Sequence, residues 1–292
     1  MTRAIGHYDI IEQIDSGSMA TIYRVRDRRT GREHAIKMLH LDNDEEASER
    51  VLREGRAMLG LQHKNIVGVD EVINHMGKPG FVMDYVDGPT LDEWINDTDS
   101  TLTTRMALFH GIAEGLHHLH MRGVIHRDLQ PANILIQTVD GVLVPRIIDL
   151  GLSKHVRDTG ITDMHSVFGT LGYIAPEQIK STATVGHRAD IFSLGCILYV
   201  LACEAEPFDA ESDLKLMDLI VATKYTPPRE VVPDLPDSIV RAIVACLEHD
   251  PHKRIHHSRW VLRVLQGAPW PQQPTNQTPV PPGRVRGPFV PN

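Results

Sequence analysis

Two short segments of the chain combine residue types that suit one kind of chemistry. The segment HRDLQPAN contains Asp128 and, five positions later, Asn133, and the segment IIDLG contains Asp149. We expect these segments to form two loops separated by a short pair of strands. A carboxylate on the first loop would orient an attacking hydroxyl oxygen, and an oxygen ligand from each loop would hold the magnesium ions that accompany ATP. The pattern therefore indicates transfer of a phosphoryl group to a hydroxyl.

The elements that would position these loops change in character along the chain. Strands are expected over residues 8–14, 21–26, 34–39, 66–72 and 81–86, with one amphipathic helix over residues 44–61. Helices are expected over residues 101–121, 187–203, 213–222, 236–247 and 256–266, where apolar residues recur at helical spacing. We therefore predict an α+β fold with two lobes: residues 1–87 form a small, mostly-β N-lobe with five strands and one helix, and residues 88–267 form a larger, mostly-α C-lobe.

The C-terminal residues 268–292 differ from the rest of the chain in composition. Prolines fill eight of these 25 positions, and few of the other residues could form a core. Such a composition is typical of a disordered or polyproline-like tail. A ligand for a proline-binding domain is the alternative interpretation of the same segment.

The bulk composition excludes several classes of protein. Of the 292 residues, 41% are hydrophobic and 23% are charged, as in ordinary soluble globular proteins. The net charge of −8 argues against nucleic acid as the main partner. The N-terminus lacks the apolar stretch of a secretory signal, and the longest mostly apolar run, residues 191–203, is too short to span a bilayer. We expect a cytoplasmic protein with no membrane segment in this chain, or the cytoplasmic part of a longer membrane protein.

The motifs, taken together and in this order, resemble those of the eukaryotic-type protein kinases, in particular the bacterial serine/threonine kinases. The similarity runs from about residue 8 to residue 266 and includes DSGSMA, HAIKML, HRDLQPAN, DLG and APE. It implies a two-lobed fold with ATP in the cleft between the lobes, Mg²⁺ as the cofactor, and protein substrates that present Ser or Thr. It also implies self-phosphorylation, which members of the family often carry out as dimers, so a second copy of the chain is a candidate partner.

The resemblance assigns nucleotide binding to the N-lobe, to a hinge near residues 84–86 and to the two loops. Lys37 would reach the α- and β-phosphates and pair with Glu54 on the following helix. The turn DSGSMA keeps only Gly17 of the three family glycines, so we expect it to cover ATP with lower affinity; as an isolated motif it would be simply a hairpin turn. The complete set of expected ATP-binding residues is Ile14, Gly17, Ile22, Ala35, Lys37, Glu54, Met83, Asp84, Val86, Asn133 and Asp149.

The same resemblance gives roles to the residues of the two loops. Asp128 would orient the substrate hydroxyl, and Asn133 and Asp149 would each bind Mg²⁺. Gln130 occupies the position where most serine/threonine kinases carry Lys, and we count it with Asp128 and Lys37 among the catalytic residues. Arg127 implies control by a phosphate on the segment after Asp149, where the candidate acceptors are Thr159, Thr162, Ser166 and Thr170.

The departure at Gln130 leaves more than one function open. The missing lysine would place a positive charge on the γ-phosphate, and its loss would lower the rate by roughly 10²–10³. The other catalytic residues are all present, which favours an active but slow serine/threonine kinase. The alternative is an ATP-binding pseudokinase or signalling scaffold. A third hypothesis is an interaction module that works through the proline-rich tail.

Other residues are expected to support the fold rather than the chemistry. Glu177 and Arg254 match a buried ion pair of the family, and Asp190 matches the residue that anchors the catalytic loop. Met83 would limit the depth of the ATP pocket, although a plain core methionine would look identical in sequence.

Histidines are frequent, with 17 in the chain. His117, His118 and His120 surround one helical turn, but no cysteine or carboxylate lies at a matching spacing for a metal site. We therefore interpret the histidines as ordinary core or surface residues.

Overall fold

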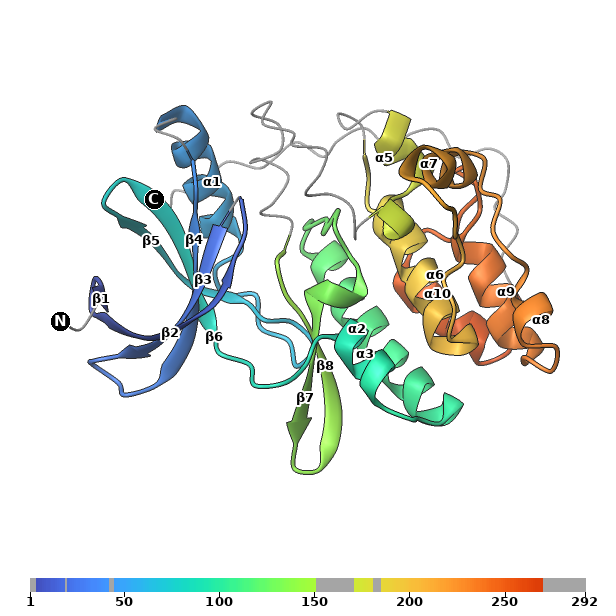
Figure 1. Ribbon diagram of the computed structural model, residues 1–292, viewed down its shortest axis with the longest axis horizontal. Coiled ribbons are helices and arrows are strands. Elements are labelled where there is room, and N and C mark those ends of the chain that lie inside the picture. The colour runs from blue at the N-terminus through green and yellow to red at the C-terminus, as the bar shows by residue number, and fades with distance from the viewer. Residues whose placement is uncertain (1–3, 19, 42–44, 151–170, 181–184, 270–292) are drawn as a thin grey trace, which may run out of the picture.

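The computed structural model describes residues 4–18, 20–41, 45–150, 171–180 and 185–269, and these residues fold into two lobes (Figure 1). One lobe, on the left in Figure 1, is built on a sheet of strands from the N-terminal part of the chain. The other, on the right, consists mainly of helices. The predicted two-lobed α+β fold is confirmed.

The described residues of the N-lobe form one antiparallel sheet and one helix, α1 (Glu45–Ala57). The strands lie in the order β1-β2-β3-β4-β6-β5. Their bounds are β1 (Ala4–Ile5), β2 (Tyr8–Ser16), β3 (Ala20–Asp27), β4 (Glu33–Leu39), β5 (Val69–His75) and β6 (Lys78–Asp84). The short β1 was not predicted, because two residues carry no periodic pattern.

The strands β5 and β6 differ from their predicted bounds for a physical reason. The strand expected over residues 66–72 begins only at Val69, because the backbone N of Val67 donates to the backbone O of Ile147 in the C-lobe at 2.8 Å. The two strands then join through a tight turn in which Met76 and Gly77 both have positive φ, 54° and 82°. The segment before β5 therefore ties the two lobes together.

Alternation of side chains across the sheet decides where Lys37 points. Ile36 and Met38 belong to a small apolar cluster on one face. Lys37 lies between them in sequence, so its side chain emerges on the opposite face, which also bears Phe81 of the main core. The helix α1 packs on that face so closely that a Cβ at Gly55 would lie 2.1 Å from the Phe81 ring.

The C-lobe combines a small sheet with a set of helices. Its elements are α2 (Leu91–Asp97), α3 (Leu102–Met121), β7 (Ile134–Val139), β8 (Val142–Ile147), α5 (Pro176–Lys180), α6 (Arg188–Cys203), α7 (Asp213–Val221), α8 (Pro228–Val231), α9 (Asp237–Cys246) and α10 (Ser258–Leu265). The five helices predicted here are found within two residues of their expected ends. The strand pair expected between the two loops is β7 and β8, which pair antiparallel.

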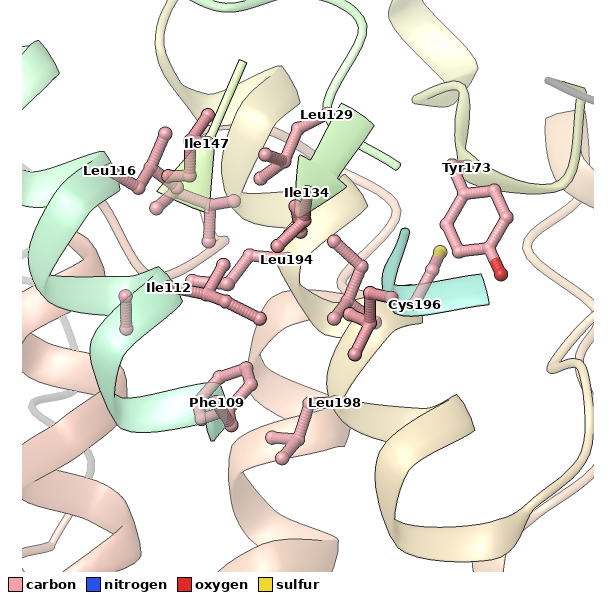
Figure 2. Close-up of a cluster of buried hydrophobic side chains, with 14 of the residues drawn as sticks. Phe109, Ile112, Leu116, Leu129, Ile134, Ile147, Tyr173, Leu194, Cys196 and Leu198 are labelled. Carbon is pink, nitrogen blue, oxygen red and sulfur yellow. The ribbon is translucent and has the colours of Figure 1, made fainter. Parts of the chain in front are cut away.

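The main core reaches the loops that carry the candidate catalytic residues. Leu129 and Ile134, on either side of residues 130–133, are buried in the same cluster as Ile112 of α3 and Leu194 of α6 (Figure 2). Every residue of α6 after Arg188 is buried, so this helix forms the centre of the lobe. The loops therefore rest directly on the buried core of the C-lobe.

Some predictions fall outside the described residues. The four candidate phosphate acceptors between Thr159 and Thr170 lie there, as do residues 270–292 of the proline-rich tail. Within the part of the chain that the structure describes, none of the helices has the length and apolar character needed to cross a membrane.

Candidate active site

A buried carboxylate on α6 holds the loop that carries Asp128. Asp190 is fully buried, and it accepts a hydrogen bond from His120 Nε2 on α3 at 2.7 Å. It also accepts from the backbone N of His126 at 2.8 Å and from that of Arg127 at 2.7 Å. Burial alone would raise the pKa of Asp190, but these hydrogen bonds and the neighbouring imidazoles hold it below its ordinary value. The ionised carboxylate therefore fixes the backbone immediately before Asp128.

The two catalytic loops are also joined to each other. The buried side chain of His126 contacts the backbone O of Ile148 through Nε2 at 2.8 Å. The backbone N of Ile148 in turn donates to the backbone O of Asn133 at 3.0 Å. Since Ile148 precedes Asp149, these bonds fix the position of the second loop relative to the first.

The carboxylate of Asp128 is oriented by two amide side chains. Gln130 Nε2 donates to Asp128 Oδ1 at 3.2 Å, and Asn133 Nδ2 approaches Oδ2 at 3.3 Å. Asn133 Nδ2 donates more strongly to the backbone O of Asp128, at 2.8 Å. Because Nδ2 is used in this way, Oδ1 of Asn133 is the atom that can ligate a cation.

Residues of the two lobes meet at an ion pair. Lys37 Nζ, from β4 of the N-lobe, lies 2.7 Å from Asp149 Oδ2, and both side chains are largely buried. Glu54, the expected partner of Lys37, lies on α1, but its side chain is outside the described part of the structure. The structure therefore pairs Lys37 with the carboxylate of the second loop.

Two residues of the loops adopt a backbone conformation that side chains rarely favour. Arg127 has φ of 66° and Asp149 has φ of 61°, and such strain costs about 1–3 kcal/mol per residue. Arg127 is held in place from both sides, because its N donates to Asp190 and its O accepts from Gln178 Nε2 at 2.9 Å. Sequence reasoning missed Gln178; its position directly after the APE motif was the available signal.

Four of the expected ATP-binding residues of the N-lobe share one face of the sheet. Ile22 is paired with Lys37, and Ala35 with Met83, so these four side chains lie on the face that bears Lys37. Ile14, near the end of β2, is 49% exposed. After Met83 the chain continues through Asp84, the last residue of β6, to Val86, which is buried in the main core.

The turn that contains Gly17 is held by hydrogen bonds. Gly17 N donates to the backbone O of Ala20 at 2.9 Å. The ring of His40 contacts Thr21 Oγ1 at 2.9 Å through Nε2 and the backbone O of Ser18 at 3.3 Å through Nδ1. Sequence reasoning missed His40, which follows β4 and braces this turn.

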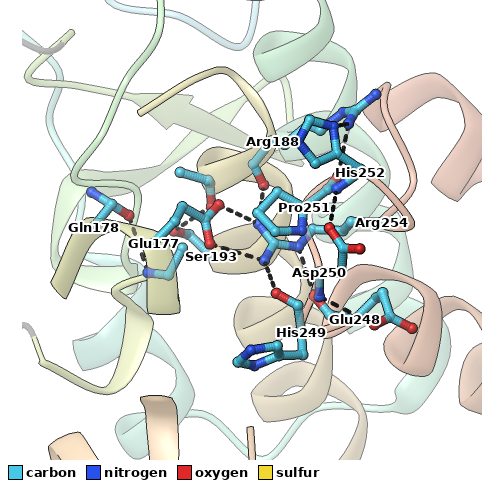
Figure 3. A network of polar contacts seen from close by, with 12 residues as sticks. Glu177, Gln178, Arg188, Ser193, Glu248, His249, Asp250, Pro251, His252 and Arg254 are labelled. Carbon is cyan, nitrogen blue, oxygen red and sulfur yellow. Dashed lines mark hydrogen bonds and ion pairs between the residues drawn. The ribbon is translucent and has the colours of Figure 1, made fainter. Parts of the chain in front are cut away.

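A second ion pair secures the C-lobe near its catalytic loops. Arg254 is fully buried, and its guanidinium donates to Glu177 Oε1 at 2.7 Å and to Oε2 at 3.1 Å (Figure 3). It also donates to the backbone O of Arg188 at 2.7 Å and of Glu248 at 3.0 Å, and it lies over the Phe192 ring. The geometry matches the expected structural pair.

The donor atoms at the two loops fit a magnesium ion. Mg²⁺ prefers carboxylate and amide oxygens, usually with only one or two carboxylates from the protein. Asp149 supplies such a carboxylate, and Asn133 supplies an amide oxygen on the neighbouring loop. When bound, Mg²⁺ would neutralise charge on the phosphates of ATP.

One further group of possible metal ligands occurs among the described residues. His34, Asp70 and Asp84 bring their ligand atoms within 4.8 Å of one another on neighbouring strands of the N-lobe sheet. Both aspartates are exposed, and exposed carboxylates gather often without an ion, so we do not assign a metal to this group.

Comparison with known proteins identifies the same fold and family. A family model described as a protein kinase domain matches residues 8–265. The chain is 32% identical over 256 residues to the serine/threonine-protein kinase PrkC of Bacillus subtilis, which covers 86% of the chain. It is 32% identical over 263 residues to the DNA damage-responsive serine/threonine-protein kinase RqkA of Deinococcus radiodurans, covering 87% of the chain. The alignments cover only 39% and 38% of these two relatives.

Solved structures show the same architecture. The kinase domain of Mycobacterium tuberculosis PknI, in a C20A_R136A double mutant, superposes with a TM-score of 0.72 at 21% identity, covering 91% of this chain and 97% of that one. Rad53, residues 1–466 in complex with AMP-PNP, superposes with a TM-score of 0.71 at 26% identity, covering 89% of this chain and 65% of that one.

Proposed function

The chain belongs to the protein kinase family, and we propose that it is an active serine/threonine kinase that transfers the γ-phosphate of ATP to Ser or Thr hydroxyls of protein substrates. The observation that carries this proposal is the 2.7 Å ion pair between Lys37 and Asp149. It brings a cation from one lobe and a carboxylate from the other to one point, beside the loop that carries Asp128. A kinase needs these two side chains close together, because the lysine contacts the phosphates of ATP while the aspartate holds Mg²⁺.

The residues of the two loops take separate roles in this proposal. Asp128 orients the substrate hydroxyl and accepts its proton. Asn133 and Asp149 hold Mg²⁺. Gln130 keeps the carboxylate of Asp128 in position through the hydrogen bond to Oδ1.

We assign the nucleotide to the face of the N-lobe sheet that bears Lys37. The Rad53 structure, which contains AMP-PNP, supports a nucleotide site in this fold. Residues that would contact or cover ATP, besides those of the two loops, are Ile14, Gly17, Ile22, Ala35, Lys37, Met83, Asp84 and Val86, with Glu54 as a partner for Lys37. We propose that the boundary between the lobes lies between residues 87 and 88.

Intact-mass spectrometry of the purified chain after incubation with Mg²⁺ and ATP tests the proposal. Wild type is expected to gain the mass of one or more phosphates, and peptide mapping then locates them. Asp128→Asn is expected to gain none, because Asn cannot accept the hydroxyl proton. Asp140→Asn, an exposed aspartate in the turn between β7 and β8, is the matched control and should behave as wild type.

Two further measurements decide the outcome if wild type gains no phosphate. An external Ser/Thr protein substrate tests whether only the acceptor is missing. Transfer to neither acceptor, with nucleotide binding retained, would contradict the proposal and favour the pseudokinase hypothesis. Loss of transfer in Asp140→Asn as well would show that the assay reports folding rather than chemistry.

The partners of the protein remain part of the proposal. We propose that a second copy of the chain is one substrate, which predicts a rate of phosphate incorporation that rises with the square of the protein concentration. The chain spans about two fifths of the length of the curated relatives it matches, so their substrates are not transferred to it.

A further inference from the structure

Five histidines gather where α3, the start of α6 and the start of α10 meet. This histidine cluster comprises His117, His120, His187, His256 and His257. The ring of His187 lies 5.5 Å from that of His120 and is stacked on that of His257 at 5.9 Å. His257 in turn lies 4.5 Å from His256 and 6.5 Å from His117. The helix α3 packs against both α6 and α10, so helix packing holds the rings together.

Protonated imidazole rings would have few hydrogen-bond acceptors in this cluster. Four ring nitrogens are buried and make no hydrogen bond within the described part of the chain: Nδ1 of His117, His120 and His257, and Nε2 of His187. Among the described residues, the titratable or charged groups that act on the rings are Glu114 and His118 from α3, Arg188 and Asp190 from α6, and Arg259 from the start of α10, and the backbone of His256 forms a hydrogen bond with His187. The one buried carboxylate among them, Asp190, already accepts three hydrogen bonds.

The surroundings oppose the charged form of the imidazoles. Burial is the main cause that lowers the pKa of His117, of His187 and of His256. Burial and the other rings of the cluster together lower the pKa of His257 to about 4. A second protonation is disfavoured further, because the rings then repel one another.

The histidine cluster contacts the anchor of the catalytic loop. His120 joins the cluster through His187 and donates Nε2–H to Asp190 at 2.7 Å. Asp190 in turn holds the backbone N–H groups of His126 and Arg127. A displacement of the rings would therefore reach the loop through two contacts.

We propose that the histidine cluster makes the catalytic-loop anchor acid-sensitive: protonation of His187 and His257 pushes the rings apart, draws His120 away from Asp190 and loosens the loop before Asp128. At mildly acidic pH the open form of the loop, in which His187 and His257 accept protons, would then be populated up to about tenfold more than at neutral pH, while the rest of the fold persists.

Proton linkage gives the direction and the size of the effect of acid on folding stability. When folding lowers the pKa of a histidine, the unfolded chain binds the proton first, so stability is complete above pH about 6.5 and falls as the pH approaches the folded value. For His257, a pKa lowered from 6.5 to about 4 makes the unfolding equilibrium constant up to about tenfold larger at pH about 5.5 than at neutral pH. About tenfold is the maximum, because the ring is partly exposed and solvent screens its charge.

The experiment compares wild type with His187→Gln/His257→Gln and with His110→Gln. Gln cannot titrate, and His110 is an exposed residue of α3 outside the cluster. Urea unfolding at pH about 7.5 and about 5.5 measures the change in the unfolding equilibrium constant. Hydrogen exchange, corrected for intrinsic rates, follows the amides of His126 and Arg127 at the same two pH values. Neither measurement depends on kinase activity, so a failure here is separate from a failure of the proposed function.

Acid is expected to destabilise wild type and His110→Gln, and to speed exchange of the two loop amides in both, while the double variant loses most of each response. Equal responses in the double variant and wild type would overturn the proposal. A stability change without faster exchange of the loop amides would also overturn it, since the coupling to Asp190 would be absent. If the double variant does not fold, wild type alone decides: faster exchange of the His126 and Arg127 amides at pH about 5.5, together with a His257 pKa below the ordinary 6.5 in an NMR titration, supports the proposal, and unchanged exchange or a His257 pKa near 6.5 overturns it.

Discussion

Replacement of Arg254 by Met tests how the C-lobe is held together. The guanidinium of Arg254 makes two hydrogen bonds to Glu177 and further ones to the backbone O atoms of Arg188 and Glu248 (Figure 3). Met keeps the length of the side chain but supplies no donor. The carboxylate of Glu177, whose side chain is only 22% exposed, would then have lost its cation.

The magnitude follows from what each variant leaves unpaired. Removing one partner of a buried ion pair costs about 3–5 kcal/mol, and we expect Arg254→Met to lie in this range. Glu177→Gln is milder, about 1.5–3 kcal/mol, because Arg254 keeps its backbone acceptors. The two changes share one interaction, so the double variant should fall short of the sum by about 1–3 kcal/mol.

Urea unfolding followed by circular dichroism measures these free energies. Lys253→Met is the matched control, since Lys253 is the exposed neighbour of Arg254, and it should change stability by no more than about 0.5 kcal/mol. A loss below about 1 kcal/mol in Arg254→Met, or strict additivity in the double variant, would refute the reasoning.

Two other variants probe packing and charge. Gly195→Ala would place a Cβ 2.4 Å from Cys246 Cβ inside the core, so we expect a loss of about 1–3 kcal/mol in unfolding free energy. Gly186→Ala is the control and should be nearly neutral, because no atom lies within 4 Å of its Cβ position. Gln130→Lys should raise the turnover measured with a saturating peptide substrate by about 10–10², because it adds a cation near the transferring phosphate; an unchanged or lower rate would contradict this.

Periodic patterns predicted most of the fold because they record burial directly. The helix expected over residues 101–121 is α3, and its start is marked by Thr101, whose side chain accepts from Thr104 N at 3.2 Å. The helix α2 was missed although Thr90 and Glu93 form a capping box, because its seven residues carry too little periodicity. Contacts between segments distant in the sequence produce no periodic pattern that could be read in advance. The backbone N of Val67, for example, bonds to Ile147 and does not extend β5.

The residues of the candidate site that belong to family motifs were predictable from the sequence. Contacts that form only when separate helices pack together were not. The resemblance to the kinase motifs predicted that Lys37 reaches the phosphates of ATP, and the structure pairs it with Asp149 of the second loop. The histidine cluster could not be foreseen, because His120, His187 and His257 come from three separate helices and meet only after these pack. The expectation of ordinary histidines missed this arrangement.

Gln130, at the position where most serine/threonine kinases carry Lys, supplies no charge but has a positioning role of its own. Gln130 is 8% exposed and donates to Asp128 Oδ1, while Asn133 approaches Oδ2. A neutral amide cannot stabilise charge on a transferring phosphate as a cation does, but it fixes the direction of the carboxylate that receives the hydroxyl proton. Gln130→Leu separates the two effects, since it removes the hydrogen bond and leaves the charge unchanged. We expect it to lower kcat by about tenfold with little change in KM for ATP; a kcat equal to that of wild type would show that Gln130 does not position Asp128.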